Sequence, residues 1–123
     1  RFGLYDAFLI KENHIKACGS IKKAIVMARS VPGNLLVEVE VETLDELQEA
    51  LAAKPDRILL DNFDHQMLVD AVAMNAPWRC ELEASGGVSL ETIATIAETG
   101  VDYISVGAMT KSVRAIDLSL LVK

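Results

Sequence analysis

The sequence predicts an α/β fold of the TIM-type (β/α) barrel class, in an incomplete form with about five parallel βα units. Short apolar runs rich in β-branched residues alternate with helical patterns along the chain, which is typical of a parallel sheet with right-handed crossovers. Polar residues or glycines end each predicted strand. The chain has 123 residues, whereas a closed eight-stranded barrel needs about 250, so we expect only part of a barrel.

The first half of the chain contains two predicted strands and two predicted helices. The first strand is residues 7–10. Ser20 is a suitable N-cap for a helix with apolar residues at i, i+3, i+4 and i+7, which ends before the next proline. Residues 35–41 form the second predicted strand. Thr43 then caps a helix with Glu46 at the N3 position, which is the pattern of a capping box.

The second half of the chain continues the alternation. Further strands are predicted at residues 57–60, 79–83 and 103–106. A helix is predicted at residues 64–74, and another follows the N-cap Ser89 and ends at Gly100, where glycine suits the left-handed residue after a helix. Residues 115–121 are expected to form a closing helix or strand.

The run LLVEVEVE at residues 35–42 places valines on one face of its strand and glutamates on the other. Alternation of this kind is common in antiparallel strands with one solvated face. A parallel sheet is normally covered on both faces, so the glutamate face needs another purpose unless the strand lies at an edge. We expect Glu40 to face a ligand, Glu38 to lie deeper and pair with a basic side chain, and Glu42 to be solvated.

Five strand-end residues are expected to converge on one mouth, because the C-terminal strand ends of a (β/α) barrel meet there and carry its chemistry. They are Lys11, Glu40, Asp61, Glu83 and Gly107. Burying charges is costly unless they pair with one another or with a ligand. Either a structural salt-bridge cluster or a ligand site is therefore possible for Lys11, Glu40 and Asp61.

A phosphate site is predicted at two glycine corners. Ser85, Gly86 and Gly87 end one predicted strand and precede a helix, so backbone N–H groups are exposed near a positive helix end. Gly107 and Ala108 form a similar corner after the next strand. One such turn is a weak signal, because glycine there often meets only a backbone requirement. Two corners in adjacent units favour phosphate binding.

Composition limits the partners. The formal charge is −6 and the 12 basic residues are scattered, so no nucleic-acid partner is expected. No apolar run approaches the roughly 20 residues needed to cross a bilayer, so no membrane partner is expected. Cys18 and Cys80 form neither a CxxC pair nor a disulfide framework, and we expect a cytoplasmic protein with buried or bystander thiols. The chain starts at Arg1 without a methionine, and an N-terminal part is expected to be missing.

Several residues that often carry function are assigned structural roles. His14 and His65 have no partner at metal-ligand spacing, and we expect packed or capping histidines. Met67, Met74 and Trp78 are expected to belong to the core without any cofactor role.

Ordered motifs of the chain resemble the quinolinate phosphoribosyltransferase family, also called carboxylating nicotinate-nucleotide pyrophosphorylase. They are the N-terminal RFGLYDAFLIKENH, then EVEVE, LLDNF, EASGGV and finally GVDYISVGAMTKSVRAIDLSL, and together they span nearly the whole chain. The resemblance implies a cytosolic transferase of NAD biosynthesis. Such an enzyme joins quinolinate to phosphoribosyl pyrophosphate and releases pyrophosphate and CO2 to give nicotinate mononucleotide, with Mg²⁺ carried by the pyrophosphate substrate.

The resemblance also assigns residues. Arg1 and Lys11 would hold the quinolinate carboxylates, a task suited to a guanidinium and an ammonium group. Glu40 and Asp61 would lie near the ribose and the metal, with Lys11, Glu40 and Asp61 as catalytic residues. Three turn residues would grip the ribose 5′-phosphate: Ser85, Gly86 and Gly107. Many relatives have histidine where this chain has Lys111.

The family also has an N-terminal domain, the first barrel strands and an arginine donated across a dimer interface. The resemblance therefore implies that residues 1–123 are the C-terminal part of the barrel domain, inactive alone, in a protein that forms a homodimer or a higher homo-oligomer. Two other interpretations stay open. One is a related phosphoribosyltransferase-like barrel of the molybdate-transport type, and the other is a non-catalytic segment that binds a phosphorylated ligand.

Overall fold

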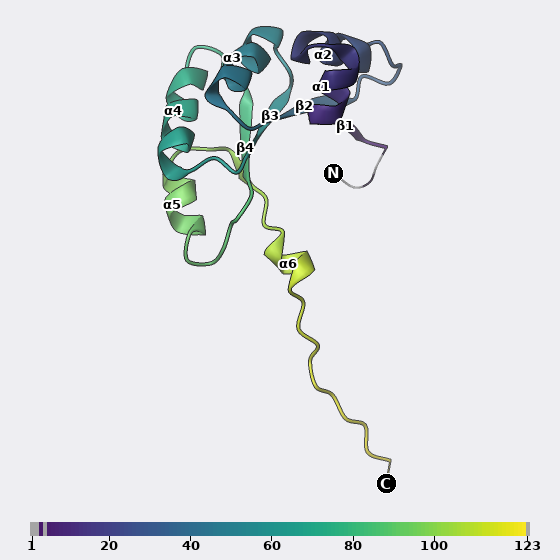
Figure 1. The fold of residues 1–123 in the computed structure, drawn as a ribbon. Coiled ribbons are helices and arrows are strands. Elements are labelled where there is room, and N and C mark those ends of the chain that lie inside the picture. Colours follow the sequence, from purple (N-terminus) through teal and green to yellow (C-terminus); the bar gives the residue numbers. More distant parts are fainter. Residues whose placement is uncertain (1–2, 4, 123) are drawn as a thin grey trace.

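Five parallel strands form one open sheet in the order β1-β2-β3-β4-β5 (Figure 1). The computed structural model describes residue 3 and residues 5–122. The strands are β1 (Ala7–Ile10), β2 (Leu36–Val41), β3 (Arg57–Asp61), β4 (Glu81–Ser85) and β5 (Tyr103–Ile104). The helices are α1 (Glu12–Cys18), α2 (Ile21–Arg29), α3 (Leu44–Ala53), α4 (His65–Asn75), α5 (Ile93–Glu98) and α6 (Ala108–Lys111). The predicted incomplete α/β barrel is confirmed.

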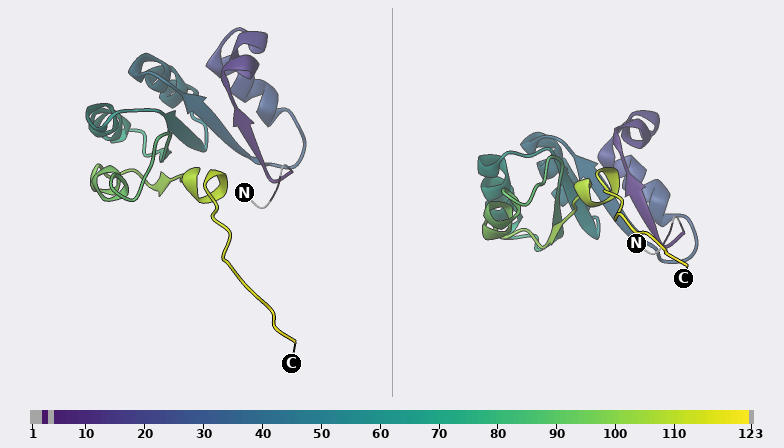
Figure 2. Two further views of the ribbon diagram at one scale, coloured as in Figure 1. Left: turned by 60° about the horizontal axis from the view of Figure 1, so that its bottom comes forward. Right: turned by 90° about the horizontal axis from the view of Figure 1, so that it is seen from below.

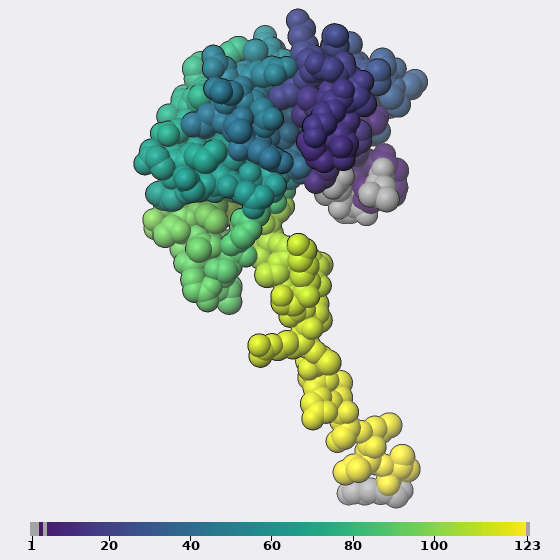
Figure 3. All heavy atoms as spheres, viewed as in Figure 1, coloured from purple at the N-terminus to yellow at the C-terminus, as the bar shows by residue number. Residues whose placement is uncertain are grey.

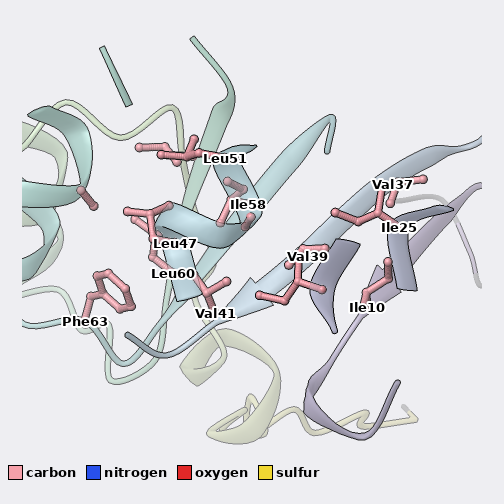
Figure 4. Close-up of a cluster of buried hydrophobic side chains, with 14 of the residues drawn as sticks. Ile10, Ile25, Val37, Val39, Val41, Leu47, Leu51, Ile58, Leu60 and Phe63 are labelled. Atoms are coloured by element: carbon pink, nitrogen blue, oxygen red, sulfur yellow. The ribbon is translucent and has the colours of Figure 1, made fainter. Parts of the chain in front are cut away.

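The main core lies between the sheet and the helices on its outer side. Helices α1 to α5 follow the outside of the curved row of strands, whereas α6 lies at the open side (Figure 2). Figure 4 shows side chains from both layers in this core, among them Ile25 of α2, Val39 of β2 and Leu47 of α3. Val37, Val39 and Val41 are at most 1% exposed. The valine face of β2 is therefore fixed against the helices, and its glutamates must point to the inside of the curve.

Local sequence signals explain where the main helices begin. The side chains of Ser20, Thr43 and Asp64 each accept a hydrogen bond from the backbone N–H three residues later. These contacts satisfy donors that the first turn of a helix leaves without an intrahelical partner. The predicted capping box is formed only in part, because the Glu46 carboxylate accepts from the N–H of Glu42 rather than from that of Thr43.

The boundaries around β4 differ from the prediction. The strand begins at Glu81, not at residue 79, because Arg79 has a left-handed backbone (φ 54°) and the Asn75 side chain brackets the backbone of Cys80. Helix α5 begins at Ile93 rather than directly after Ser89, where a turn closed by Thr92 intervenes. Gly100 has the predicted left-handed conformation.

Two short helices were not predicted. Helix α1 follows β1 directly, and His14 Nδ1 accepts a hydrogen bond of 3.0 Å from the Lys11 N–H, which confirms the capping role expected for this histidine. Helix α6 follows the Gly107 corner. Its four residues are too few for an apolar period to be recognised in the sequence.

Two predictions were wrong. Trp78 is 46% exposed and is not a core residue, because it lies in the turn between α4 and β4, whereas Met67 and Met74 pack against the core. Residues 115–121 form neither a helix nor a strand. They extend away from the domain (Figure 3), so their apolar side chains have no surface among the described residues against which to order.

Candidate functional site

The glutamate row of β2 becomes more exposed toward the C-terminal end of the strand. Glu38 is 4% exposed, Glu40 is partly buried, and Glu42 is exposed as expected. Carboxylate oxygens of Glu40, Glu42 and Asp61 lie within 4.8 Å of one another. Asp61 ends β3, the neighbouring parallel strand, so the sheet brings these acids together at one edge.

Lys11 balances part of this negative charge. Its Nζ lies 2.6 Å from Glu40 Oε2. The hydrogen bond to Glu40 raises the pKa of Lys11, and the charges of Glu40 and Asp61 add to this effect against a smaller opposing contribution from burial. Lys11 therefore carries a positive charge at neutral pH, and two residues that the sequence placed at one mouth are in direct contact.

Asn62 belongs to the same edge, although the sequence analysis gave it no role. Its side-chain amide donates to Asp61 Oδ2 at 2.8 Å, and its backbone N–H donates to Ser85 O at 2.9 Å. It therefore orients the carboxylate and joins the ends of β3 and β4. The available signal was an asparagine directly after the last residue of a strand, since asparagine tolerates the left-handed backbone (φ 56°) found here.

A cavity of about 560 Å³ opens beside Asp61 between the two glycine corners. All five residues predicted for the phosphate line it: Ser85, Gly86, Gly87, Gly107 and Ala108. Ser105, Lys111 and Ser112 complete the lining on the β5 and α6 side. The cavity thus combines glycine corners, serine residues and a lysine, a set that suits an anionic oxygen-rich ligand.

Gly86 allows the two sides of this cavity to approach closely. Its backbone is left-handed (φ 93°), and a Cβ atom here would lie 2.2 Å from Asn62 Oδ1 and 2.9 Å from Asn62 N. No larger residue fits without movement of the Asn62 backbone. The glycine is required by packing at the mouth as well as by its φ angle.

A group of charged side chains lies near the start of β3 and β4, farther from the C-terminal strand ends than the mouth. The Arg57 guanidinium pairs with Glu81 at 2.8 Å and Glu83 at 3.5 Å, and it stacks 3.9 Å from the centroid of the Tyr103 ring. Partial burial lowers the pKa of Arg57, but the hydrogen bond with Glu81 and the charges of Glu81 and Glu38 outweigh this effect and raise it. Arg57 also aligns with Glu38 in the β2–β3 register, which agrees with the basic neighbour expected for that glutamate.

The predicted site residues that the structure describes therefore lie along one continuous edge. Asp61 belongs both to the acidic group and to the cavity lining, so it links Lys11 and Glu40 to the glycine corners. Arg1 lies outside the described residues. His65 is the first residue of α4 and does not belong to the acidic group.

Fold and mouth together define the class of this domain. It is a parallel (β/α)-barrel segment that gathers polar groups and glycine corners at the C-terminal ends of its strands. A family model described as "Quinolinate phosphoribosyl transferase, C-terminal domain" matches residues 1–121. The chain belongs to this family, which confirms the resemblance found in its motifs.

Individual relatives carry names that agree with this family. The chain is 46% identical over 121 residues to the probable nicotinate-nucleotide pyrophosphorylase [carboxylating] of Bacillus subtilis, with 98% of this chain and 42% of that protein covered. It is 47% identical to the nicotinate-nucleotide pyrophosphorylase [carboxylating] of Mycobacterium leprae, with 98% and 43% covered. The chain thus spans about two fifths of the length of these relatives.

Solved structures show the same fold. The structure of the nicotinate-nucleotide pyrophosphorylase from Francisella tularensis superposes with a TM-score of 0.87 at 52% identity, covering 95% of this chain and 41% of that one. Thiamine phosphate pyrophosphorylase from Pyrococcus furiosus superposes with a TM-score of 0.64 at 21% identity over 82% of this chain and 48% of that one, which is a likeness of fold alone.

Proposed function

We propose that residues 1–123 form the C-terminal barrel part of a carboxylating nicotinate-nucleotide pyrophosphorylase. The reaction transfers the phosphoribosyl group of phosphoribosyl pyrophosphate to quinolinate and yields nicotinate mononucleotide, pyrophosphate and CO2. The observation that carries the proposal is the continuous edge from Lys11 through Glu40 and Asp61 to the cavity at Gly86 and Gly107. Family membership and relatives carrying this name support it.

In this proposal the glycine corners and Ser85 bind the 5′-phosphate of the sugar. The backbone N–H groups of Gly86, Gly87 and Ala108 would donate hydrogen bonds to this phosphate, because a glycine corner lets the chain approach a phosphate closely. Lys111 supplies a cation to the same cavity.

Glu40 and Asp61 would act on the reacting sugar carbon. As the C1–O bond to pyrophosphate breaks and the pyridine nitrogen bonds to C1, positive charge builds up on the sugar, and nearby carboxylates stabilise it. The ring carboxylate beside the nitrogen then leaves as CO2 and a proton replaces it on the ring carbon. Lys11, with Arg1, would hold the quinolinate carboxylates.

Magnesium enters as part of the pyrophosphate substrate. Glu40 and Asp61 would offer it carboxylate oxygens, the ligand type that Mg²⁺ prefers, and these oxygens lie within 4.8 Å of each other. The chain's own contribution is to hold these oxygens close together and to offset part of their repulsion with the positive charge of Lys11. Glu42, the exposed member, would contact water rather than substrate.

The complete protein is proposed to be a cytoplasmic homodimer or higher homo-oligomer in which an N-terminal part and a partner subunit complete the substrate cage. The described residues contain no helix long and apolar enough to cross a membrane. The sheet is open beyond β1 and β5, so we expect the 123-residue chain alone to be inactive. Steady formation of nicotinate mononucleotide by this chain alone would contradict that expectation.

The test uses the complete protein, with the N-terminal part supplied natively or by fusion to that part of the Bacillus subtilis relative. Glu40→Gln and Asp61→Asn keep the shape of each side chain and remove its charge, so we expect kcat to fall by one or more powers of ten. Glu42→Gln is the matched control and should change kcat less than threefold. A protein that only binds a phosphorylated ligand would form no nicotinate mononucleotide with any of the variants.

A further inference from the structure

Ser105 lines the cavity, and its hydroxyl is committed as a donor. It donates to Glu83 Oε1, and an ionised carboxylate can only accept. Glu83 Oε2 is held by the Arg57 guanidinium at 3.5 Å, so both oxygens of this carboxylate are engaged. The side chain of Glu83 is only 13% exposed. The Ser105 oxygen therefore offers the cavity its lone pairs and not its proton.

This polarity does not suit a phosphate. A phosphate dianion presents only acceptor oxygens, so it gains nothing from a hydroxyl whose proton is already used. A sugar hydroxyl, by contrast, has a proton to donate. Ser105 comes two residues before Gly107 and its backbone N–H is bound to Ala84 O at 2.9 Å, so strand pairing fixes its position at the cavity wall beside the glycine corner.

We propose that Ser105 is a specificity residue that accepts a hydrogen bond from a ring hydroxyl of the bound sugar phosphate, and that Glu83, fixed by Arg57, is the positioning residue that sets this polarity. The inference rests on the proposed function, because it requires a sugar phosphate in the cavity. It assigns the glycine corners to the phosphate and the Ser105 side of the cavity to the sugar.

Two ligands of matched shape test the inference in the complete protein by isothermal titration calorimetry. One is 1,4-anhydroribitol 5-phosphate, which has both ring hydroxyls, and the other is tetrahydrofurfuryl phosphate, which has the same ring and phosphate but neither hydroxyl. The measured quantity is the ratio of their dissociation constants. We expect Ser105→Ala to lower the preference for the hydroxylated ligand about fivefold while the affinity for tetrahydrofurfuryl phosphate stays unchanged.

Glu83→Gln should change the two measured quantities in opposite directions. An amide in place of the carboxylate lets the Ser105 proton turn toward the cavity, so the preference for the hydroxylated ligand should fall and the affinity for tetrahydrofurfuryl phosphate should rise. A purely structural role for Glu83 would weaken both ligands together. Ser112→Ala, the same change on the same wall, is the control and should alter both affinities by one common factor.

The outcomes separate the two proposals. If wild-type protein binds both ligands and Ser105→Ala weakens them equally or leaves the ratio unchanged, the role of Ser105 is refuted while the phosphate site stands. If wild-type protein binds neither ligand, the proposed function is refuted and the inference falls with it. Ser105 is exposed, so its truncation is not expected to unfold the domain.

Discussion

Replacing Gly86 with alanine should cost far more stability than the same change one residue later. Gly86 and Gly87 both have left-handed backbones, with φ of 93° and 61°. An alanine Cβ at Gly86 would lie 2.2 Å from Asn62 Oδ1 and 2.9 Å from Asn62 N, whereas one at Gly87 meets nothing within 4 Å. The neighbouring pair therefore separates the cost of backbone conformation from the cost of a clash.

The magnitudes follow from these contacts. A left-handed alanine costs about 1 kcal/mol, which is the whole expected effect of Gly87→Ala. Gly86→Ala adds about 1–3 kcal/mol of overpacking and strains the hydrogen bond from Asn62 N to Ser85 O, worth about 1 kcal/mol. We expect a loss of about 3–5 kcal/mol in the free energy of unfolding.

Urea denaturation followed by circular dichroism measures both variants, and a third background tests the clash itself. Asn62→Ala removes the side-chain contact at 2.2 Å but leaves the backbone contact at 2.9 Å. Gly86→Ala should therefore cost less in that background, yet still more than Gly87→Ala. Equal losses for the Gly86 and Gly87 variants, within about 0.5 kcal/mol, would refute the close approach between the β3 and β4 ends.

Three further changes probe the support of the mouth and the core. Arg57→Ala should destabilise the domain by about 2 kcal/mol, because it leaves partly buried carboxylates without their cation, whereas Arg29→Ala at an exposed pair should cost less than about 1 kcal/mol in the same urea experiment. Burial raises the pKa of the Cys80 thiol to about 11, with smaller contributions from nearby carboxylates. Iodoacetamide at pH 8 should therefore label Cys80 in urea but hardly in the folded protein, which mass spectrometry can measure. Equal labelling in both states would contradict this expectation. Since the folded pKa of Cys80 lies above its unfolded value of 9.0, its contribution to stability is complete below pH 9 and is lost between pH 9 and about 11, and Cys80→Ala should remove that pH dependence. Thr43→Ala removes an N-cap and should cost about 1 kcal/mol, while Thr95→Ala within α5 should change the melting curve little.

The sequence was sufficient to predict the order of the strands and which residues gather at their C-terminal ends, although β4 ends at Ser85 rather than at residue 83 and β5 ends at Ile104 rather than at residue 106. Lys11, Glu40 and Asp61 could be placed at one edge because parallel strands share the direction of their C-terminal ends, whatever the details of the loops. The N-caps Ser20 and Thr43 were also correct, since a capping hydroxyl interacts with its own first helical turn and needs no distant partner.

Features that depend on contacts distant in the chain could not be predicted. Trp78 was assigned to the core from its apolar character, yet its exposure is set by the turn between α4 and β4. The start of β4 was misplaced because the left-handed Arg79 carries no sequence signal, unlike a glycine. Asn62 was missed for a similar reason: Ser85, which accepts from its backbone N–H, becomes its neighbour only when β3 and β4 pair.

The main core between the sheet and the helices determines which side chains of β2 face the mouth. Val37, Val39 and Val41 are locked between the sheet and the helices, and because side chains alternate along a strand, this packing alone fixes which way the glutamates point. A slip of one residue would bury three carboxylates in an aliphatic layer, at a cost of several kcal/mol for each ion, and would turn the valines toward Lys11. A valine-to-alanine change in β2 should therefore lower stability without redirecting Glu40, whereas no change at Glu40 should alter the strand register. The geometry of the acidic group is thus set by apolar residues on the opposite face of the strand.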